Sequence, residues 1–96
     1  MISFNYLFYF FKKIIYTSKF AREYKKLPKK IKLLAEKKEK IFRMNSANLI
    51  LNTHKLHGRF KNFWSFSIDF EYRIIFEFGD NNIVYFHSIG NHSIYE

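Results

Sequence analysis

Two segments in the last third of the chain alternate large apolar side chains with small or polar ones, and this alternation constrains the fold most strongly. They span residues 63–68 and 72–78, and a third apolar segment follows at residues 83–89. Because successive side chains of a β-strand point to opposite faces of a sheet, the alternation predicts strands with one apolar face. Residues 79–82, Gly-Asp-Asn-Asn, are typical of a tight turn. We therefore expect a three-stranded meander at the end of the chain.

The first half of the chain carries helical periodicity. A β-branched and aromatic run at residues 13–16 predicts a first strand, and Thr17-Ser18 then offers an N-cap. Apolar side chains follow at helical spacing as far as Leu27, where Pro28 stops the helix and also suits the first turn of another. This second helix is expected from residue 29 to about residue 43. Its apolar stripe consists of Ile31, Leu34, Ala35, Ile41 and Phe42.

The resulting order, β-α-α-β-β-β, predicts an α+β fold in which a helical hairpin packs on a mainly antiparallel sheet. A chain of 96 residues makes one domain, which we place at residues 12–96. The loop at residues 45–52 is expected to be anchored by Leu49, Ile50 and Leu51. The chain has no cysteine, which excludes disulfides and thiolate metal sites and fits a reducing cytosol.

Residues 1–11 form an uncharged, apolar N-terminal extension. It is too short to span a bilayer, which takes about 20 apolar residues. A signal peptide would carry positive charge before its apolar run, whereas Lys12 and Lys13 follow this one. We read the segment as an N-terminal extension that runs into the first strand. The alternatives are an over-long start of the reading frame and a weak membrane-surface anchor.

The charge is unevenly distributed along the chain. Residues 1–61 contain 16 Lys and Arg against 3 Asp and Glu, a net charge of +13, whereas residues 62–96 have a net charge of −4. Such a basic half implies an anionic partner, which could be nucleic acid, a membrane surface or an acidic protein. The alternative is that the lysines only solvate an exposed helix face.

Several short motifs, taken in order, resemble those of the RelE/ParE superfamily of type II toxins. They are Ser18-Lys19-Phe20, His54-Lys55-Leu56-His57-Gly58, Phe63-Trp64-Ser65, Tyr72-Arg73-Ile74-Ile75-Phe76, and Ile89-Gly90-Asn91-His92 with Tyr95. Within the superfamily, the C-terminal motif is similar to the YafQ-type branch, and Phe-Trp-Ser followed by Tyr-Arg is similar to the YoeB-type branch. Both branches are ribosome-dependent messenger RNA interferases, whereas the ParE branch poisons DNA gyrase. A Gly-x-His ending argues mildly against the ParE branch, which lacks the catalytic set.

The resemblance implies a catalytic role for Arg73, His92, Tyr95 and His54. Arginine suits a phosphorane because its planar fork meets two oxygens at once, and histidine suits proton transfer near neutral pH. Tyr95 could stack on a nucleobase or donate its phenol to a phosphate. The alternatives are that Arg73 pairs with one of the nearby carboxylates, that His92 is an ordinary tail residue, and that Tyr95 covers the edge of the core. These carboxylates are Asp69, Glu71 and Glu77.

Basic side chains around His54 form a second group of candidates. Lys55, Arg59 and Lys61 make a short cationic run that suits an RNA backbone, unless it is a solvated loop. Lys30 and Lys37 of the second helix are expected to dock on ribosomal RNA rather than to take part in chemistry. His87 is expected to be a packed or hydrogen-bonded histidine inside the last strand.

Two positions depart from the patterns that the resemblance carries. Ile50 stands where the YoeB-type branch has its glutamate base, and Ser67 stands where the YafQ-type branch has a histidine. The base is then His54, His92 or Glu71, or none of them is efficient. The ribosome could also align the message well enough for a weak base to suffice.

The leading hypothesis is a cytoplasmic toxin that cleaves messenger RNA on the ribosome without a metal or another cofactor. Its partners would be a cognate antitoxin, the ribosome and the message, and not a membrane. The alternatives are a ParE-like toxin that binds gyrase, a degenerate module that only binds an antitoxin, and a protein attached to a membrane through residues 1–11.

Overall fold

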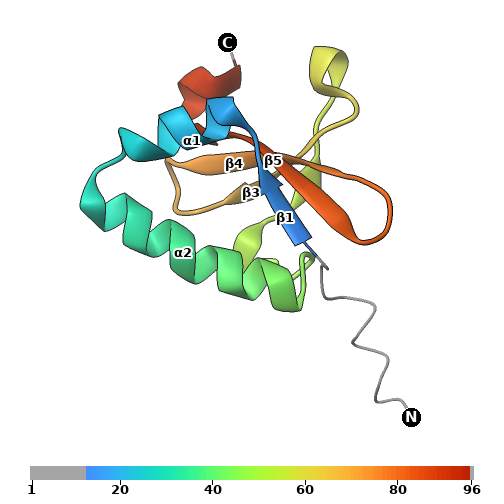
Figure 1. The fold of residues 1–96 in the computed structure, drawn as a ribbon, viewed down its shortest axis with the longest axis horizontal. Helices are drawn as coiled ribbons and strands as arrows, with labels where there is room; N and C mark the ends of the chain where they lie inside the picture. Colours follow the sequence, from blue (N-terminus) through green and yellow to red (C-terminus); the bar gives the residue numbers. More distant parts are fainter. Residues whose placement is uncertain (1–12, 96) are drawn as a thin grey trace.

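Two helices and a five-stranded sheet make up the computed structural model, which describes residues 13–95 apart from the side chain of Ser93 (Figure 1). The elements are β1 (Lys13–Tyr16), α1 (Ser18–Lys25), α2 (Lys29–Met44), β2 (His54–Lys55), β3 (Trp64–Ser67), β4 (Arg73–Phe78) and β5 (Ile83–Gly90), with three short 3₁₀ turns, η2 (Leu49–Leu51), η3 (Gly58–Phe60) and η4 (His92–Tyr95). The predicted α+β fold, with helices packed on a mainly antiparallel sheet, is confirmed. The predicted extension at residues 1–11 lies outside the described residues.

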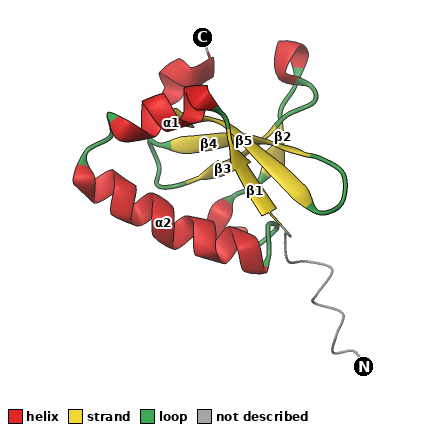
Figure 2. Cartoon of the chain, viewed as in Figure 1, coloured by secondary structure: helices red, strands yellow, loops and turns green. Residues whose placement is uncertain are grey.

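The strands follow the order β1-β5-β4-β3-β2 across the sheet. Figure 2 draws them as yellow arrows. The predicted meander forms β3, β4 and β5, which pair antiparallel, whereas β1 pairs with β5 in parallel. The sequence predicts no strand at His54–Lys55, because two polar residues carry no apolar alternation. In the structure they pair with Ser65 and Trp64 as the edge strand β2.

Capping and proline position the two helices as predicted. The Thr17 hydroxyl accepts a hydrogen bond from the Phe20 amide at 3.1 Å, which satisfies one of the unpaired amides at the start of α1. Pro28 separates α1 from α2 and occupies the N-cap position of α2. The helical pair therefore begins and turns where the local sequence dictates.

The ring of Phe42 joins α2 to three strands of the sheet. It is fully buried and lies 4.7 Å from Phe66 of β3, 4.8 Å from Phe76 of β4 and 5.5 Å from Phe86 of β5, measured between ring centroids. Aromatic rings at such separations add edge and stacking attraction to the burial of apolar area. This cluster is the centre of the core.

A β-bulge interrupts the pairing of β4 with β5. Ile75 lies opposite Ser88 and Phe76 opposite Phe86, which leaves His87 as an extra residue on β5. Bulges of this kind redirect side chains. Here both His87 and Ser88 turn to the face of the sheet that the core does not occupy, where they line the same hollow as Ile75.

Glu23 of α1 forms hydrogen bonds with the edge of β5 that lies beyond the end of β1. Its carboxylate accepts hydrogen bonds from the Ser88 hydroxyl at 2.8 Å, the Ile89 amide at 3.0 Å and the Lys19 ammonium at 3.0 Å. Burial raises the pKa of Glu23, but these hydrogen bonds outweigh burial and hold the pKa below its ordinary value of 4.5. The ionised carboxylate therefore stabilises the folded state.

Only one of the three predicted loop anchors is buried. Leu51 is fully inaccessible, whereas Leu49 is 94% exposed and Ile50 is 57% exposed. The three residues form the single 3₁₀ turn η2, in which consecutive side chains point in three different directions. A turn of this kind can direct only one of the three side chains into the core.

Replacement of Phe42 tests the core. We expect Phe42→Ala to lower the free energy of unfolding by about 3–5 kcal/mol, because it leaves a cavity among three other rings. Urea denaturation would measure this change. Leu49→Ala, at an exposed position, should change stability by no more than about 0.5 kcal/mol, and equal losses in both variants would contradict the placement of the core.

Replacement of Glu23 tests the link between α1 and β5. We expect Glu23→Gln to lower the free energy of unfolding by about 1–2 kcal/mol at pH 7, because bonds to a charged acceptor are stronger than bonds to a neutral one. Since the pKa of Glu23 is lower in the folded state, its contribution is present above the ordinary value of 4.5 and is lost as pH falls through the folded value.

The measurement is urea denaturation of the wild type and the variant between about pH 7 and pH 3. The difference between them should shrink at the acidic end. Glu71→Gln, in an exposed turn, is the control and should stay within about 0.5 kcal/mol of the wild type at pH 7. A difference for Glu23→Gln that grows as the pH falls would refute this account.

Candidate functional site

The face of the sheet opposite the Phe42 cluster carries the polar side chains of the meander. Because core side chains occupy alternate positions of β3 and β4, the residues between them must point the other way. The register places Ser67 beside Arg73, and Arg73 beside Gly90. We call this surface the arginine face and define it by Ser65, Ser67, Arg73, Ile75 and Glu77.

Arg73 is held by a hydroxyl rather than by a carboxylate. One of its terminal nitrogens donates to the hydroxyl oxygen of Ser67 on the neighbouring strand. Two of the three carboxylates that could have paired with it are engaged elsewhere: Asp69 accepts from two backbone amides of its own turn, and Glu77 contacts His87. No ion pair within residues 13–95 involves Arg73. A guanidinium has five N–H donors, so this arrangement leaves donors for an anionic ligand.

The C-terminal turn η4 folds back over the arginine face. A side chain at Gly90 would lie 2.6 Å from the Ile94 methyl group, so the close return of the chain requires glycine there. The Tyr95 and Ser65 hydroxyls lie 3.0 Å apart, and the Arg59 guanidinium donates to the Tyr95 carbonyl oxygen at 2.7 Å. These contacts bring the predicted C-terminal site residues onto the same face as Arg73.

Two of the predicted histidines lie at this face. His54 pairs with Ser65, and its Nδ1 lies 3.0 Å from the carbonyl oxygen of Asn52. A carbonyl oxygen only accepts, so Nδ1 carries the proton and the neutral ring keeps a lone pair on Nε2. His92 is exposed, and its ring centroid is 6.4 Å from that of Tyr95. Both imidazoles are exposed to solvent.

The predicted RNA-binding cations divide between the two sides of the sheet. The exposed Lys55 of β2 pairs with Trp64 and so lies on the core side of the sheet, whereas Lys61 is exposed next to η3, beside the arginine face. Arg59 lies there too, but it also holds the C-terminal turn. Lys30 and Lys37 are exposed on α2, which packs against the opposite face, so the structure does not bring them to Arg73.

The contacting pair His87 and Glu77, at the arginine face, was not predicted as part of a site. His87 was expected to be packed or hydrogen-bonded, and it is, with Nε2 at 2.9 Å from Glu77 Oε1 and its ring 4.9 Å from the ring of Phe63. Alternation with the buried Val84 and Phe86 puts His87 on the arginine face, and the bulge adds Ser88 to the same face. The aromatic side chains of Phe60 and Phe63 give only a weak signal, because rings are more often core than site.

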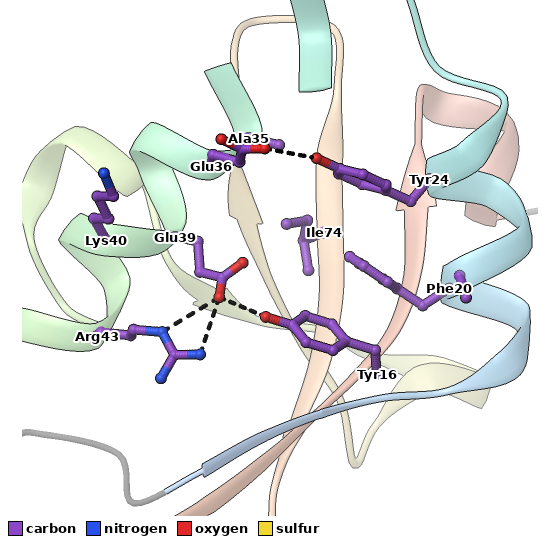
Figure 3. A pocket seen from close by; sticks show the side chains of 10 residues that line it. Tyr16, Phe20, Tyr24, Ala35, Glu36, Glu39, Lys40, Arg43 and Ile74 are labelled. Carbon is purple, nitrogen blue, oxygen red and sulfur yellow. Dashed lines mark hydrogen bonds and ion pairs between the residues drawn. The ribbon is translucent and has the colours of Figure 1, made fainter. Parts of the chain in front are cut away.

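A cleft of about 710 Å³ separates α1 from α2 (Figure 3). The Tyr16 hydroxyl donates to the Glu39 carboxylate at 2.6 Å, and Arg43 donates to the same carboxylate. Burial, followed by the bond to Glu39, raises the pKa of Tyr16 to about 12, so its hydroxyl stays protonated. The cleft is lined by Ile74, which points away from the arginine face, so it is separate from the Arg73 site.

No group of three or more His, Cys, Asp or Glu side chains in residues 13–95 is placed to hold a metal ion. None of the helices in the same range is long and apolar enough to cross a membrane.

A comparison with known protein families identifies the family of the chain. A family model described as the ParE toxin of the type II toxin–antitoxin system parDE matches residues 14–94. The chain belongs to this ParE toxin family. No curated protein matches it by sequence. The predicted membership of the RelE/ParE superfamily is therefore confirmed, and the protein is a toxin of a type II toxin–antitoxin system.

Solved structures agree with this family in fold. A YoeB/ParE toxin from Agrobacterium tumefaciens is 14% identical and superimposes with a TM-score of 0.71 over 83% of this chain and 98% of that chain. A YoeB–YefM complex from Staphylococcus aureus is 22% identical, with a TM-score of 0.68 over 82% and 94% of the two chains. YafQ from E. coli strain BL21(DE3) is 17% identical, with a TM-score of 0.66 over 85% and 94%. At these identities the similarity establishes the shared fold.

Proposed function

We propose that this ParE-family toxin is a ribosome-dependent endoribonuclease that cleaves messenger RNA without a metal. The observation that carries the proposal is the gathering of Arg73, His54, His92 and Tyr95 on one face of the sheet. Four such side chains from β2, β4 and η4 offer the donors and the proton carriers that cleavage by a neighbouring hydroxyl needs.

The chemistry is a transfer within the RNA strand. The 2′-oxygen attacks the adjacent phosphorus while a base takes its proton, the bond from phosphorus to the 5′-oxygen breaks, and an acid gives a proton to that oxygen. The products are a 2′,3′-cyclic phosphate and a 5′-hydroxyl. His54 suits the base, because its Nδ1 contact leaves the lone pair on Nε2. His92 suits the acid, and Tyr95 suits a phosphate or a base.

Arg73 suits the developing charge on the phosphate. The Ser67 hydroxyl engages one of its N–H groups, which holds the guanidinium at a defined place without neutralising it. A planar fork offers two parallel hydrogen bonds to phosphate oxygens. Donors of this kind contribute most when they are already in position before the reaction.

The remaining basic surface suits docking on ribosomal RNA. Lys61 lies beside the site, whereas Lys55 and the exposed lysines of α2 lie on the other side of the sheet. Their attraction to phosphates is independent of sequence and weakens as salt is added. This division lets the arginine face meet the message while α2 meets the surrounding RNA.

The antitoxin is the expected protein partner. Lys29, Lys30 and Lys37 surround the exposed side chain of Leu33 on α2, which suits a segment that combines acidic and apolar residues. An adjacent reading frame with a DNA-binding head and an acidic tail is the expected source of that segment.

Action on gyrase is a second candidate, because the matching family model carries the ParE name. In that case the arginine face would bind protein rather than cleave RNA. Action on gyrase would cause a DNA damage response while translation continues.

Replacement of Arg73 separates the two candidates. We expect the wild type, added to translating ribosomes, to cut messages and to leave cyclic phosphate or 3′-phosphate ends. Arg73→Ala should reduce cleavage by roughly 10²–10³-fold, because one transition-state donor is lost. Mapping of the message ends by primer extension measures the effect.

The matched control is Arg22→Ala, which removes an exposed arginine of α1 and the same charge. It should cleave about as well as the wild type. Intact messages with the wild type would refute the nuclease proposal, and gyrase poisoning by the same preparation would favour the second candidate.

A further inference from the structure

We propose that the arginine face carries a stacking platform for unpaired nucleobases, formed by Phe60, Phe63, His87 and Tyr85 and continuous with Tyr95. The inference rests on the proposed function, since it supplies the binding surface for the strand that Arg73 would cleave. It goes beyond that function because it specifies what the strand must offer, which is a run of unstacked bases next to the cleaved linkage.

The platform is a continuous series of ring contacts. Between ring centroids, Tyr95 lies 6.1 Å from Phe60, Phe60 lies 6.4 Å from Phe63, and Phe63 lies 4.9 Å from His87. His87 lies 6.3 Å from Tyr85. All five side chains are half-buried, so each ring is supported by the protein and still reaches the surface.

These rings are distinct from the hydrophobic core. The core rings lie on the α2 side of the sheet and are almost fully inaccessible. Phe60, Phe63 and His87 instead line a hollow of about 280 Å³ on the arginine face, together with Ile75 and Ile94. An apolar hollow bordered by partly exposed rings suits the flat, apolar surface of a base.

The platform extends away from Arg73 along the sheet. Arg73 pairs with Gly90 at one end of β5, whereas Glu77 pairs with Tyr85 towards the turn at residues 79–82. Glu77 follows Arg73 by four positions along the strand, a span of about 13 Å. A strand that places one phosphate at Arg73 can therefore lay its following bases over the rings.

Charges around the platform suit RNA as well. The Arg59 guanidinium lies 5.0 Å from the centre of the Phe60 ring, and the Lys19 ammonium, which also contacts Glu23 and Ser88, lies at the rim of the hollow. Glu77 is the one carboxylate of the arginine face, and it is occupied by His87. Its second oxygen is an acceptor that suits an exocyclic amine of a base.

Stacking of this kind tolerates any base, because every base presents a flat π-face. The platform therefore predicts a requirement for single-stranded RNA and little discrimination among sequences at these positions. Base-paired RNA would not fit, since its bases are already stacked on each other.

The test compares two RNA strands by fluorescence anisotropy. One is a 12-nucleotide single strand with 2′-O-methyl groups, which cannot be cleaved through the 2′-oxygen, and the other is the same backbone without bases. The abasic strand measures the electrostatic attraction alone. We expect the wild-type protein to bind the strand with bases at least about tenfold more tightly.

Single substitutions then locate the effect. Phe63→Leu keeps an apolar side chain but removes a stacking surface, and it should weaken binding of the strand with bases about tenfold while leaving the abasic strand unchanged. Phe78→Leu is the matched control, because Phe78 is also partly exposed but points to the opposite face of the sheet. Tyr85→Leu gives a second test if Phe63→Leu does not fold, as judged by urea denaturation.

Equal binding of both strands by the wild type would overturn the platform, and so would equal effects of Phe63→Leu and Phe78→Leu. The cleavage assay on ribosomes remains a separate readout. Ring-dependent binding without message cleavage would support the platform and refute the nuclease proposal. Cleavage that depends on Arg73, with equal binding of the strands with and without bases, would support the nuclease proposal and overturn the platform.

Discussion

The packing of Phe42 against three strands determines where the functional side chains lie. Its ring contacts Phe66, Phe76 and Phe86, one from each strand of the meander. A strand alternates its side chains between two faces, so fixing one residue inward fixes its neighbours outward. Burial of the core rings therefore directs the serines, Arg73 and Glu77 to the opposite face. The register of β3, β4 and β5 in the core therefore sets the positions of the side chains at the candidate site.

The β-bulge is the exception to this rule, and it also has a functional consequence. Strict alternation would send Ser88 to the core once His87 points outward, but the extra residue places both on the arginine face. Glu23 then accepts hydrogen bonds from the Ser88 hydroxyl and the Ile89 amide on the side of β5 that β1 no longer covers. A carboxylate of the first helix thus stabilises the irregular strand beneath the aromatic platform.

The family fixes the fold and the toxin class, while the chemistry depends on individual side chains. Ser67 illustrates this point. The resemblance predicts a histidine at this position in one branch, and the serine found here instead accepts a hydrogen bond from Arg73. The serine supports the guanidinium, and under the proposed function the proton carriers would come from β2 and η4.

The sequence alone determined the elements that have local causes. Alternation predicted the meander, Thr17 and Pro28 predicted the helix limits, and the family motifs pointed to Arg73, His54, His92 and Tyr95. Only the tertiary structure decided the parallel pairing of β1 with β5, the short strand β2, the bulge at His87 and the return of η4 over Gly90. Each of these depends on contacts between residues far apart in the chain, for which no local pattern of side chains exists.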